Sequence, residues 1–145
     1  MIRMAVTALA LAGLSACSTG ISSGGNTPTD RVTVDFDYRS TYAAATAQAE
    51  RCLRGEGGAY TVHGTVDDVN RTALVRVEAP FTGDDVARVT IAGQGERQSQ
   101  VDIVMWGRGI WNDVALDAMR AAVTFQVPSC TTYMPKDSPS GARKK

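Results

Sequence analysis

Three cysteines and one histidine are the side chains of this 145-residue chain best suited to covalent or acid–base chemistry. A thiolate is a nucleophile and a metal ligand, two thiols can form a disulfide, and an imidazole can act as a general base. The four residues are Cys17, Cys52, His63 and Cys130. No two of the cysteines form the closely spaced pair that is typical of zinc sites, so the sequence predicts no metal site and no cofactor.

His63 has no signature of a serine or cysteine nucleophile around it. A solvent-facing structural role on a strand is therefore favoured over general-base catalysis. The alternative is a hydrolase acting on cell-wall material, with His63 and an aspartate as base and acid. Because the chain lacks a recognisable catalytic set, the sequence predicts that the protein is not an enzyme.

Cys17 stands at the end of a segment that is typical of secreted proteins. Arg3 lies in a short charged start, residues 4–14 are small or apolar, and Leu14, Ser15 and Ala16 precede the cysteine. A charged start, an apolar run of this length and a small-residue cleavage site indicate a secretory signal, because the apolar run is too short to span a membrane.

The segment from Leu14 to Cys17 resembles the lipobox of type II signal peptides in bacterial lipoproteins. The resemblance implies that residues 1–16 are removed and that diacylglycerol is linked to Cys17, so that the lipid attaches the protein to a membrane. Ser18 stands where an aspartate signals retention at the inner membrane, which implies the outer membrane, facing the periplasm. An unlipidated secreted protein and a poorly formed transmembrane start are the alternatives.

Lipidation of Cys17 would leave two cysteines in an oxidising compartment, and we expect Cys52 and Cys130 to form a disulfide. A bridge that closes a loop of about 80 residues stabilises a fold by roughly 4 kcal/mol. Two buried free thiols are the alternative. The chain carries 15 basic and 15 acidic residues, and this balance gives no reason to expect nucleic-acid binding.

Composition divides the chain into four parts. The signal segment over residues 1–16 is followed by a lipidated tether over residues 17–30, which is rich in Gly, Ser and Thr. A flexible tether of that length would hold a domain roughly 20 Å from the membrane. A single domain is expected over residues 31–134, followed by a disordered basic tail over residues 135–145.

Hydrophobic periodicity within the domain predicts a strand from residue 31, a helix over 41–54 with Ser40 as its N-cap, and four strands. The four strands are expected at 59–66, 72–79, 86–92 and 100–106, a second helix at 110–123 and a short strand at 124–127. The first helix should turn Gln48 to solvent, and the second should turn Val114 inward. Short connections require antiparallel neighbours. The sequence therefore predicts an α+β two-layer sandwich, with a mostly antiparallel sheet of about five strands and two helices on one face.

The sheet face opposite the helices is the candidate binding surface. Alternation places Leu74, Val104 and Trp106 there, and Arg108 follows in the next turn. These residues indicate an accessory or scaffold protein that binds an envelope protein partner. In the alternative arrangement, Trp106 caps the core or stacks under Arg108.

Two polar loops support a second hypothesis, an inhibitor or small-ligand-binding module. The loops cover residues 67–70 and 93–99, and both also fit ordinary turns.

The lipobox, the tether and two motifs within the domain together resemble a group of small proteobacterial envelope lipoproteins of unknown function. One is a helix motif formed by Tyr42, Ala49, Cys52 and Leu53, and the other is the W-G-x-G-I-W turn over residues 106–111. This resemblance carries no catalytic residue over to the chain.

Overall fold

A computed structural model describes residues 19–21 and 27–131 of the chain. Cys17, the expected signal segment and the expected basic tail lie outside the described residues. The elements follow one another as β1 (Thr29–Val34), α1 (Tyr38–Cys52), a 3-10 turn η1 (Glu56–Gly58), β2 (Thr61–Asp67), β3 (Thr72–Glu78), β4 (Asp85–Gly93), β5 (Ser99–Met105) and α2 (Asp113–Phe125).

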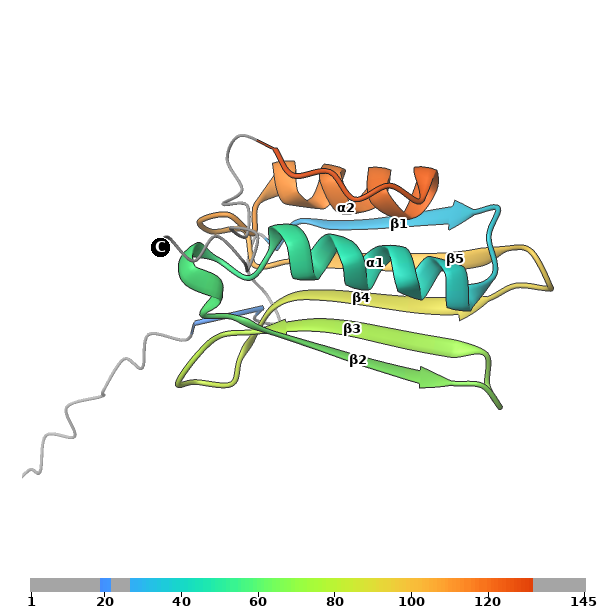
Figure 1. Cartoon of the computed structure of the whole chain (residues 1–145), viewed down its shortest axis with the longest axis horizontal. Helices are drawn as coiled ribbons and strands as arrows, with labels where there is room; N and C mark the ends of the chain where they lie inside the picture. The colour runs from blue at the N-terminus through green and yellow to red at the C-terminus, as the bar shows by residue number, and fades with distance from the viewer. Residues whose placement is uncertain (1–18, 22–26, 132–145) are drawn as a thin grey trace, which may run out of the picture.

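The five strands form one antiparallel sheet with the spatial order β1-β5-β4-β3-β2. The two helices lie side by side on the same face, with α1 over β3 and β4 and α2 over β1 and β5 (Figure 1). This arrangement confirms the predicted α+β sandwich. It also places the first strand of the chain beside the last, at the opposite edge of the sheet from β2.

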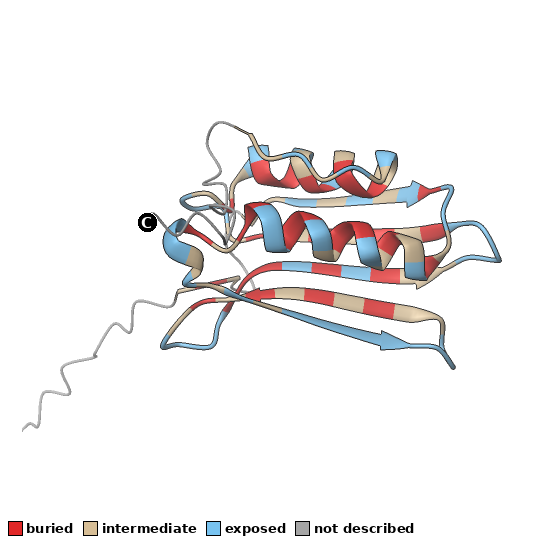
Figure 2. Cartoon of the chain, viewed as in Figure 1, coloured by how far each residue is buried: buried red, intermediate tan, exposed pale blue. Residues whose placement is uncertain are grey.

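The core lies between the sheet and the helix layer. Alternate residues along the three central strands are buried, as Figure 2 shows by colour, and the residues between them turn to the other face. The buried residues that alternate along these strands are Ala73, Val75, Val77, Ala87, Val89, Ile91, Val101, Ile103 and Met105. They are the inward residues that the alternation predicted.

The first helix begins at Tyr38, three residues before the predicted start, and its N-cap is Asp37 rather than Ser40. Oδ1 of Asp37 accepts the backbone N–H groups of Arg39 at 2.9 Å and Ser40 at 3.1 Å. The Ser40 hydroxyl donates to Oδ2 of Asp37 at 2.6 Å. Ser40 therefore lies inside the first turn, where its side chain supports the cap.

The second helix begins at Asp113, later than predicted, because Asn112 caps it by accepting the N–H groups of Val114 and Ala115. The inward stripe is accordingly formed by residues 115, 116, 119, 122 and 123, and Val114 is exposed. The predicted short strand at 124–127 is wrong. The helix continues to Phe125 and ends at Gln126, whose left-handed φ of 58° terminates it.

A disulfide joins Cys52, the last residue of α1, to Cys130, with an S–S distance of 2.03 Å. The predicted pairing is confirmed. Because Cys130 follows α2, the bridge fastens the segment after the second helix to the end of the first. Neither helix of the described ranges is long and apolar enough to cross a membrane.

Candidate functional site

The face of the sheet opposite the helices carries the candidate site. Within residues 19–21 and 27–131, no helix packs on this face (Figure 1). The strand register shows which side chains are neighbours there. Val104 lies opposite Arg88, and Arg88 lies opposite Arg76. In the adjacent row, Thr90 lies between Leu74 and Asp102.

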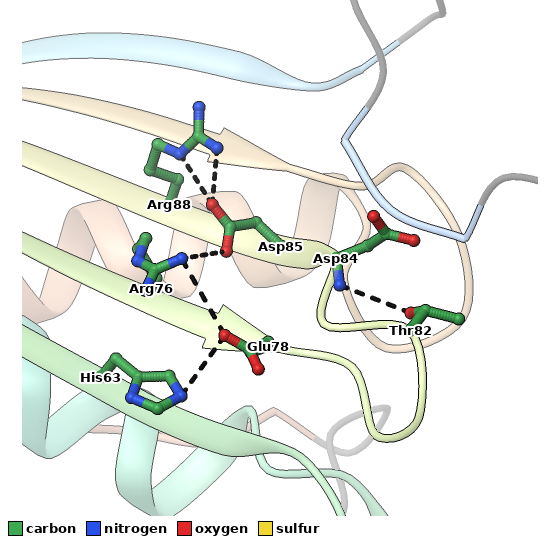
Figure 3. A network of polar contacts seen from close by, with 7 residues as sticks. All are labelled: His63, Arg76, Glu78, Thr82, Asp84, Asp85 and Arg88. Carbon is green, nitrogen blue, oxygen red and sulfur yellow. Dashed lines mark hydrogen bonds and ion pairs between the residues drawn. The ribbon is translucent and has the colours of Figure 1, made fainter.

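A network of charged side chains crosses β2, β3 and β4 on this face (Figure 3). Asp85 lies at its centre and has a side chain that is only 6% exposed. Its Oδ1 accepts Nη1 of Arg76 at 3.1 Å. Its Oδ2 accepts Nε of Arg88 at 3.0 Å and Nη2 of Arg88 at 2.5 Å. Both carboxylate oxygens are thus satisfied by guanidinium groups, as a buried charge requires.

Asp85 reaches this face because the pairing of β3 with β4 is irregular. Val77 pairs with Ala87, whereas Glu78 pairs with Asp85, so the register shifts and Val86 is an extra residue. Val86 and Ala87 are both buried, although strict alternation would turn one of them outward. The bulge therefore brings Asp85 to the side of Arg88, three residues further along the same strand.

Glu78 extends the network towards the edge strand β2. Its Oε2 lies 3.9 Å from Nη1 of Arg76 and 3.4 Å from Nε2 of His63. Arg76 directly opposes His63, and Glu78 lies two residues further along β3 on the same face, so Glu78 is the diagonal neighbour of His63. The imidazole is 44% exposed and lies beside the Glu78 carboxylate.

A groove of about 680 Å³ runs along β2, β3 and β4 on this face and is open to solvent. Asp85, Arg76 and Arg88 line one end of it. The remaining lining residues are mostly small or apolar, and they include Thr65, Leu74 and Thr90. The groove therefore combines fixed hydrogen-bond donors at one end with a largely uncharged floor.

On the other side of the face, Nε of Arg31 on β1 donates to Oδ1 of Asp102 on β5 at 2.5 Å. This hydrogen bond, together with the charge of Asp102, raises the pKa of Arg31 above its ordinary value. Both side chains are well exposed, so the pair contributes little to stability. It does fix the orientation of the guanidinium group on the open face.

The structure brings only part of the predicted binding surface together. Leu74 and Val104 lie on the open face and are half-buried, but β4 separates them, with Arg88 and Thr90 between. The apolar side chains of this face are therefore scattered among charged ones and do not form a continuous apolar patch.

Trp106 packs against the core at the end of the sandwich. Its ring centroid lies 6.2 Å from that of Trp111, which is buried and donates from Nε1 to the carbonyl of Leu53 at 3.0 Å. Arg108 is exposed, and its guanidinium carbon lies 5.8 Å from the centroid of the Trp106 ring. This is the arrangement in which Trp106 caps the core and lies under Arg108.

The two polar loops use their side chains internally. Oδ1 of Asp67 accepts the N–H groups of Val69 and Asn70, each at 3.0 Å, and Oδ2 accepts the Asn70 amide at 2.6 Å. The Asn70 side chain is the main reason why the pKa of Asp67 lies below its ordinary value. In the second loop, Gln94 N–H donates to Gln98 O at 2.7 Å, which closes a hairpin turn.

Asp85 is the site residue that the sequence does not reveal. With Gly83 and Asp84 it reads as part of a turn, and its odd spacing from Arg88 places the two on opposite faces of a regular strand. Only the bulge reverses that assignment. In the described ranges, no three His, Cys, Asp or Glu side chains gather in a way that could hold a metal ion.

No protein-family model matches this chain, and no curated protein matches it either.

Proposed function

We propose that this protein is a lipid-anchored accessory or scaffold protein of the bacterial envelope. Cys17 carries the lipid, the domain faces the periplasm from the outer membrane, and the open face of the sheet binds a protein partner without catalysing a reaction. The anchor is supported by the sequence from Leu14 to Ser18. The binding face is supported by the network around Asp85.

The observation that carries the binding proposal is that Asp85 accepts hydrogen bonds from two arginines, Arg76 and Arg88. This one carboxylate holds Arg76 and Arg88 in place, so their guanidinium groups lose little conformational freedom when a partner binds. Each guanidinium has five N–H donors, and the contacts with Asp85 and Glu78 leave several of them without a partner in the described ranges. Preorganised arginine donors are typical of the energetically important residues of protein interfaces.

The chemistry of the face also indicates the kind of partner. The two arginines are balanced by Asp85 and Glu78, and Arg31 is balanced by Asp102. The face is therefore not a strong field of one sign. It fits a protein surface that offers carboxylate and carbonyl acceptors to the arginines and an apolar side chain to Leu74.

A small-ligand site in the polar loops is supported less well, because Asp67 uses its oxygens within its own turn. The groove on the open face also differs from small-molecule sites, which enclose most of the ligand surface. A hydrolase centred on His63 would need a positioned nucleophile or acid, and the charged neighbour of the imidazole, Glu78, is half-buried and also contacts Arg76.

The anchor is tested with Cys17→Ala. We expect the variant to leave the membrane fraction or to remain as the uncleaved precursor, and to lose metabolic labelling with palmitate. Normal labelling and normal partitioning into the detergent phase would contradict the assignment of Cys17.

The binding face is tested by photo-crosslinking in living cells. A photoreactive residue at Leu74 or Thr90 lies in the groove, whereas one at Ala43 or Ala47 lies on the exposed side of α1. We expect a discrete adduct from the first pair and none from the second. Thr90→Arg, which fills the groove, should abolish the adduct formed from Leu74, and Ala47→Arg should leave it intact. The proposal would be contradicted if the groove positions and the α1 positions gave equal amounts of adduct, or if the groove positions gave none.

A further inference from the structure

The segment that follows Cys17 packs against the domain. The N–H of Ile21 donates to the carbonyl of Asp85 at 2.8 Å. Gly20 is buried, and a Cβ added to it would lie 2.7 Å from Cβ of Asp84. Its φ of +127° also favours glycine. The described part of the expected tether is therefore held at the start of β4.

Chain connectivity limits how far the lipid can be from this contact. Cys17 precedes Thr19 by two residues, and consecutive Cα atoms lie 3.8 Å apart, so the two Cα atoms are separated by no more than about 8 Å. A free tether over residues 17–30 would instead hold the domain roughly 20 Å from the membrane. A lipid on Cys17 thus brings the end of the sheet that carries Asp84 close to the bilayer.

Phe81 lies at this end, in the connection between β3 and β4 (Figure 1). Its side chain is fully exposed, at 106% relative accessibility. The loop around it is ordered: the N–H of Ala79 donates to Asp84 O at 2.8 Å, and the N–H of Gly83 donates to Ala79 O at 3.2 Å. Because Asp84 follows Phe81 by only three positions, their Cα atoms lie within about 11 Å of each other.

The backbone of Phe81 has a φ of +71°, a left-handed conformation that a bulky residue rarely adopts. Glycine adopts this conformation at no steric cost, and Gly83 in the same loop does so at a φ of 72°. The loop thus holds an aromatic side chain in water, at a conformational cost, at the end of the sheet to which Gly20 and Ile21 are bound. A phenylalanine in this situation gains free energy when its ring moves from water into an apolar phase.

We propose that Phe81 inserts into the bilayer that carries the lipid of Cys17. The occupant is a phospholipid surface at the level where headgroups meet acyl chains. Arg108 lies in the turn after β5, whose last residue pairs with Ala87 near the start of β4, and so it lies at the same end of the sheet. Its exposed guanidinium is available to the headgroup phosphates.

This contact orients the domain more than it strengthens membrane attachment. Two or three acyl chains already make a lipoprotein anchor effectively permanent, since each buried methylene contributes roughly 0.8 kcal/mol. A second point of contact at Phe81 restricts rotation of the domain about the anchor. The open face of the sheet is then presented at a defined angle to the membrane. The inference rests on the lipid anchor of the proposed function.

The test uses the full lipidated protein in vesicles of phosphatidylethanolamine and phosphatidylglycerol. Nitroxide spin labels are attached to Phe81→Cys and, as a matched control, to Val69→Cys. Val69 is also highly exposed, at 92%, but lies in the β2–β3 turn at the other end of the sheet. The native disulfide and the lipid on Cys17 leave the introduced cysteine as the free thiol.

We expect the label at position 81 to be several-fold less accessible than the label at 69 to a water-soluble nickel chelate, and more accessible to oxygen. Equal nickel accessibility at the two positions overturns the inference. Retention on the vesicles is measured in the same samples. Protein that is not retained contradicts the lipid anchor itself, whereas retained protein with an aqueous label at 81 contradicts only the insertion of Phe81.

A second pair of variants excludes an effect of the nitroxide. Relative to the parent protein, whose emission comes from Trp106 and Trp111, Phe81→Trp should add a blue-shifted component that brominated lipids quench, and Val69→Trp should add none. Equal quenching in both variants, or none in Phe81→Trp, counts against insertion. Circular dichroism of all four variants confirms that exposed-loop substitutions leave the domain folded.

Discussion

Gln48 on α1 binds both backbone polar groups of Ser129, a residue 81 positions further along the chain. Its Nε2 donates to Ser129 O at 3.1 Å, and its Oε1 accepts Ser129 N–H at 2.8 Å. Gln48 is completely buried, although the sequence placed it on the outward side of the helix. The pair lies beside the Cys52–Cys130 disulfide, so the segment after α2 is held by a covalent and a polar contact at adjacent positions.

Gln48→Met should therefore lower the free energy of unfolding by about 1–3 kcal/mol, because it removes two part-buried hydrogen bonds, each of which contributes about 0.5–1.5 kcal/mol. Ala47→Met, at the neighbouring exposed position, is the control and should change stability by less than about 0.5 kcal/mol. Both values come from urea unfolding curves. Equal stability of the two variants would show that water replaces the amide without cost.

Removal of the disulfide should have a larger effect. The bridge closes a loop with a sequence separation of 78, and the double variant Cys52→Ala/Cys130→Ala should lose up to roughly 4 kcal/mol of stability. Mass spectrometry of non-reduced, proteolysed protein should show the linked peptides. Two alkylatable thiols in protein taken directly from cells would contradict the pairing.

The antiparallel pairing from β2 to β5 and the inward faces could be predicted because they follow from local rules, whereas the place of β1 beside β5 depends on a long-range contact. Alternation along β3, β4 and β5 identifies the buried residues, and short connections force antiparallel pairing. The ends of the helices were harder to predict. Asp37 and Ser40 are both good N-cap residues, three positions apart, and the sequence alone does not decide which of them accepts the first N–H groups.

The candidate site could be predicted only in part, because its central residue depends on a bulge. Val86 is an ordinary apolar residue, and nothing in its type shows that it is the extra residue of β4. The burial of Gln48 could not be predicted either, because it depends on hydrogen bonds with Ser129, which is distant in the sequence. Polar residues of this kind are assigned to solvent whenever their distant partners are unknown.

The Asp37 cap predicts a dependence of stability on pH. The pKa of Asp37 lies below its ordinary value of 3.8, mainly because the Ser40 hydroxyl donates a hydrogen bond to the carboxylate. Backbone N–H groups also contribute. Because the pKa of Asp37 is lower in the folded state, its carboxylate contributes fully to stability at pH values above its pKa in the unfolded chain. This contribution is lost as the pH falls through the pKa of the folded state.

Asp37→Ala should cost about 0.5–2 kcal/mol at pH 7, and the difference from the parent protein should shrink below about pH 4. Asp37→Asn retains a cap without the charge and should show a smaller loss at pH 7. Urea unfolding at pH 7 and pH 3 measures both variants. If the free energies of unfolding of the parent and Asp37→Ala differ by the same amount at both pH values, the charge of Asp37 does not contribute to the cap.

Trp106 is the residue at which sequence and structure lead to opposite expectations. On the open face, as the alternation predicted, its removal would leave stability unchanged. In the structure it is half-buried against the core and faces Trp111, which is itself 4.2 Å from the ring of Tyr60. Trp106→Ala should therefore lower the free energy of unfolding by on the order of 1–3 kcal/mol, comparable to Val89→Ala in the core.

Val104→Ala provides the comparison, because Val104 lies on the open face and points away from the helices. We expect it to change stability by less than about 0.5 kcal/mol. The same variants distinguish stability from binding when they are combined with the crosslinker at Leu74. Val104→Ala should weaken the adduct while the domain stays as stable as the parent. If Trp106→Ala behaves like Val104→Ala in the unfolding measurement, Trp106 does not cap the core, and it belongs with Leu74 and Val104 on the binding face.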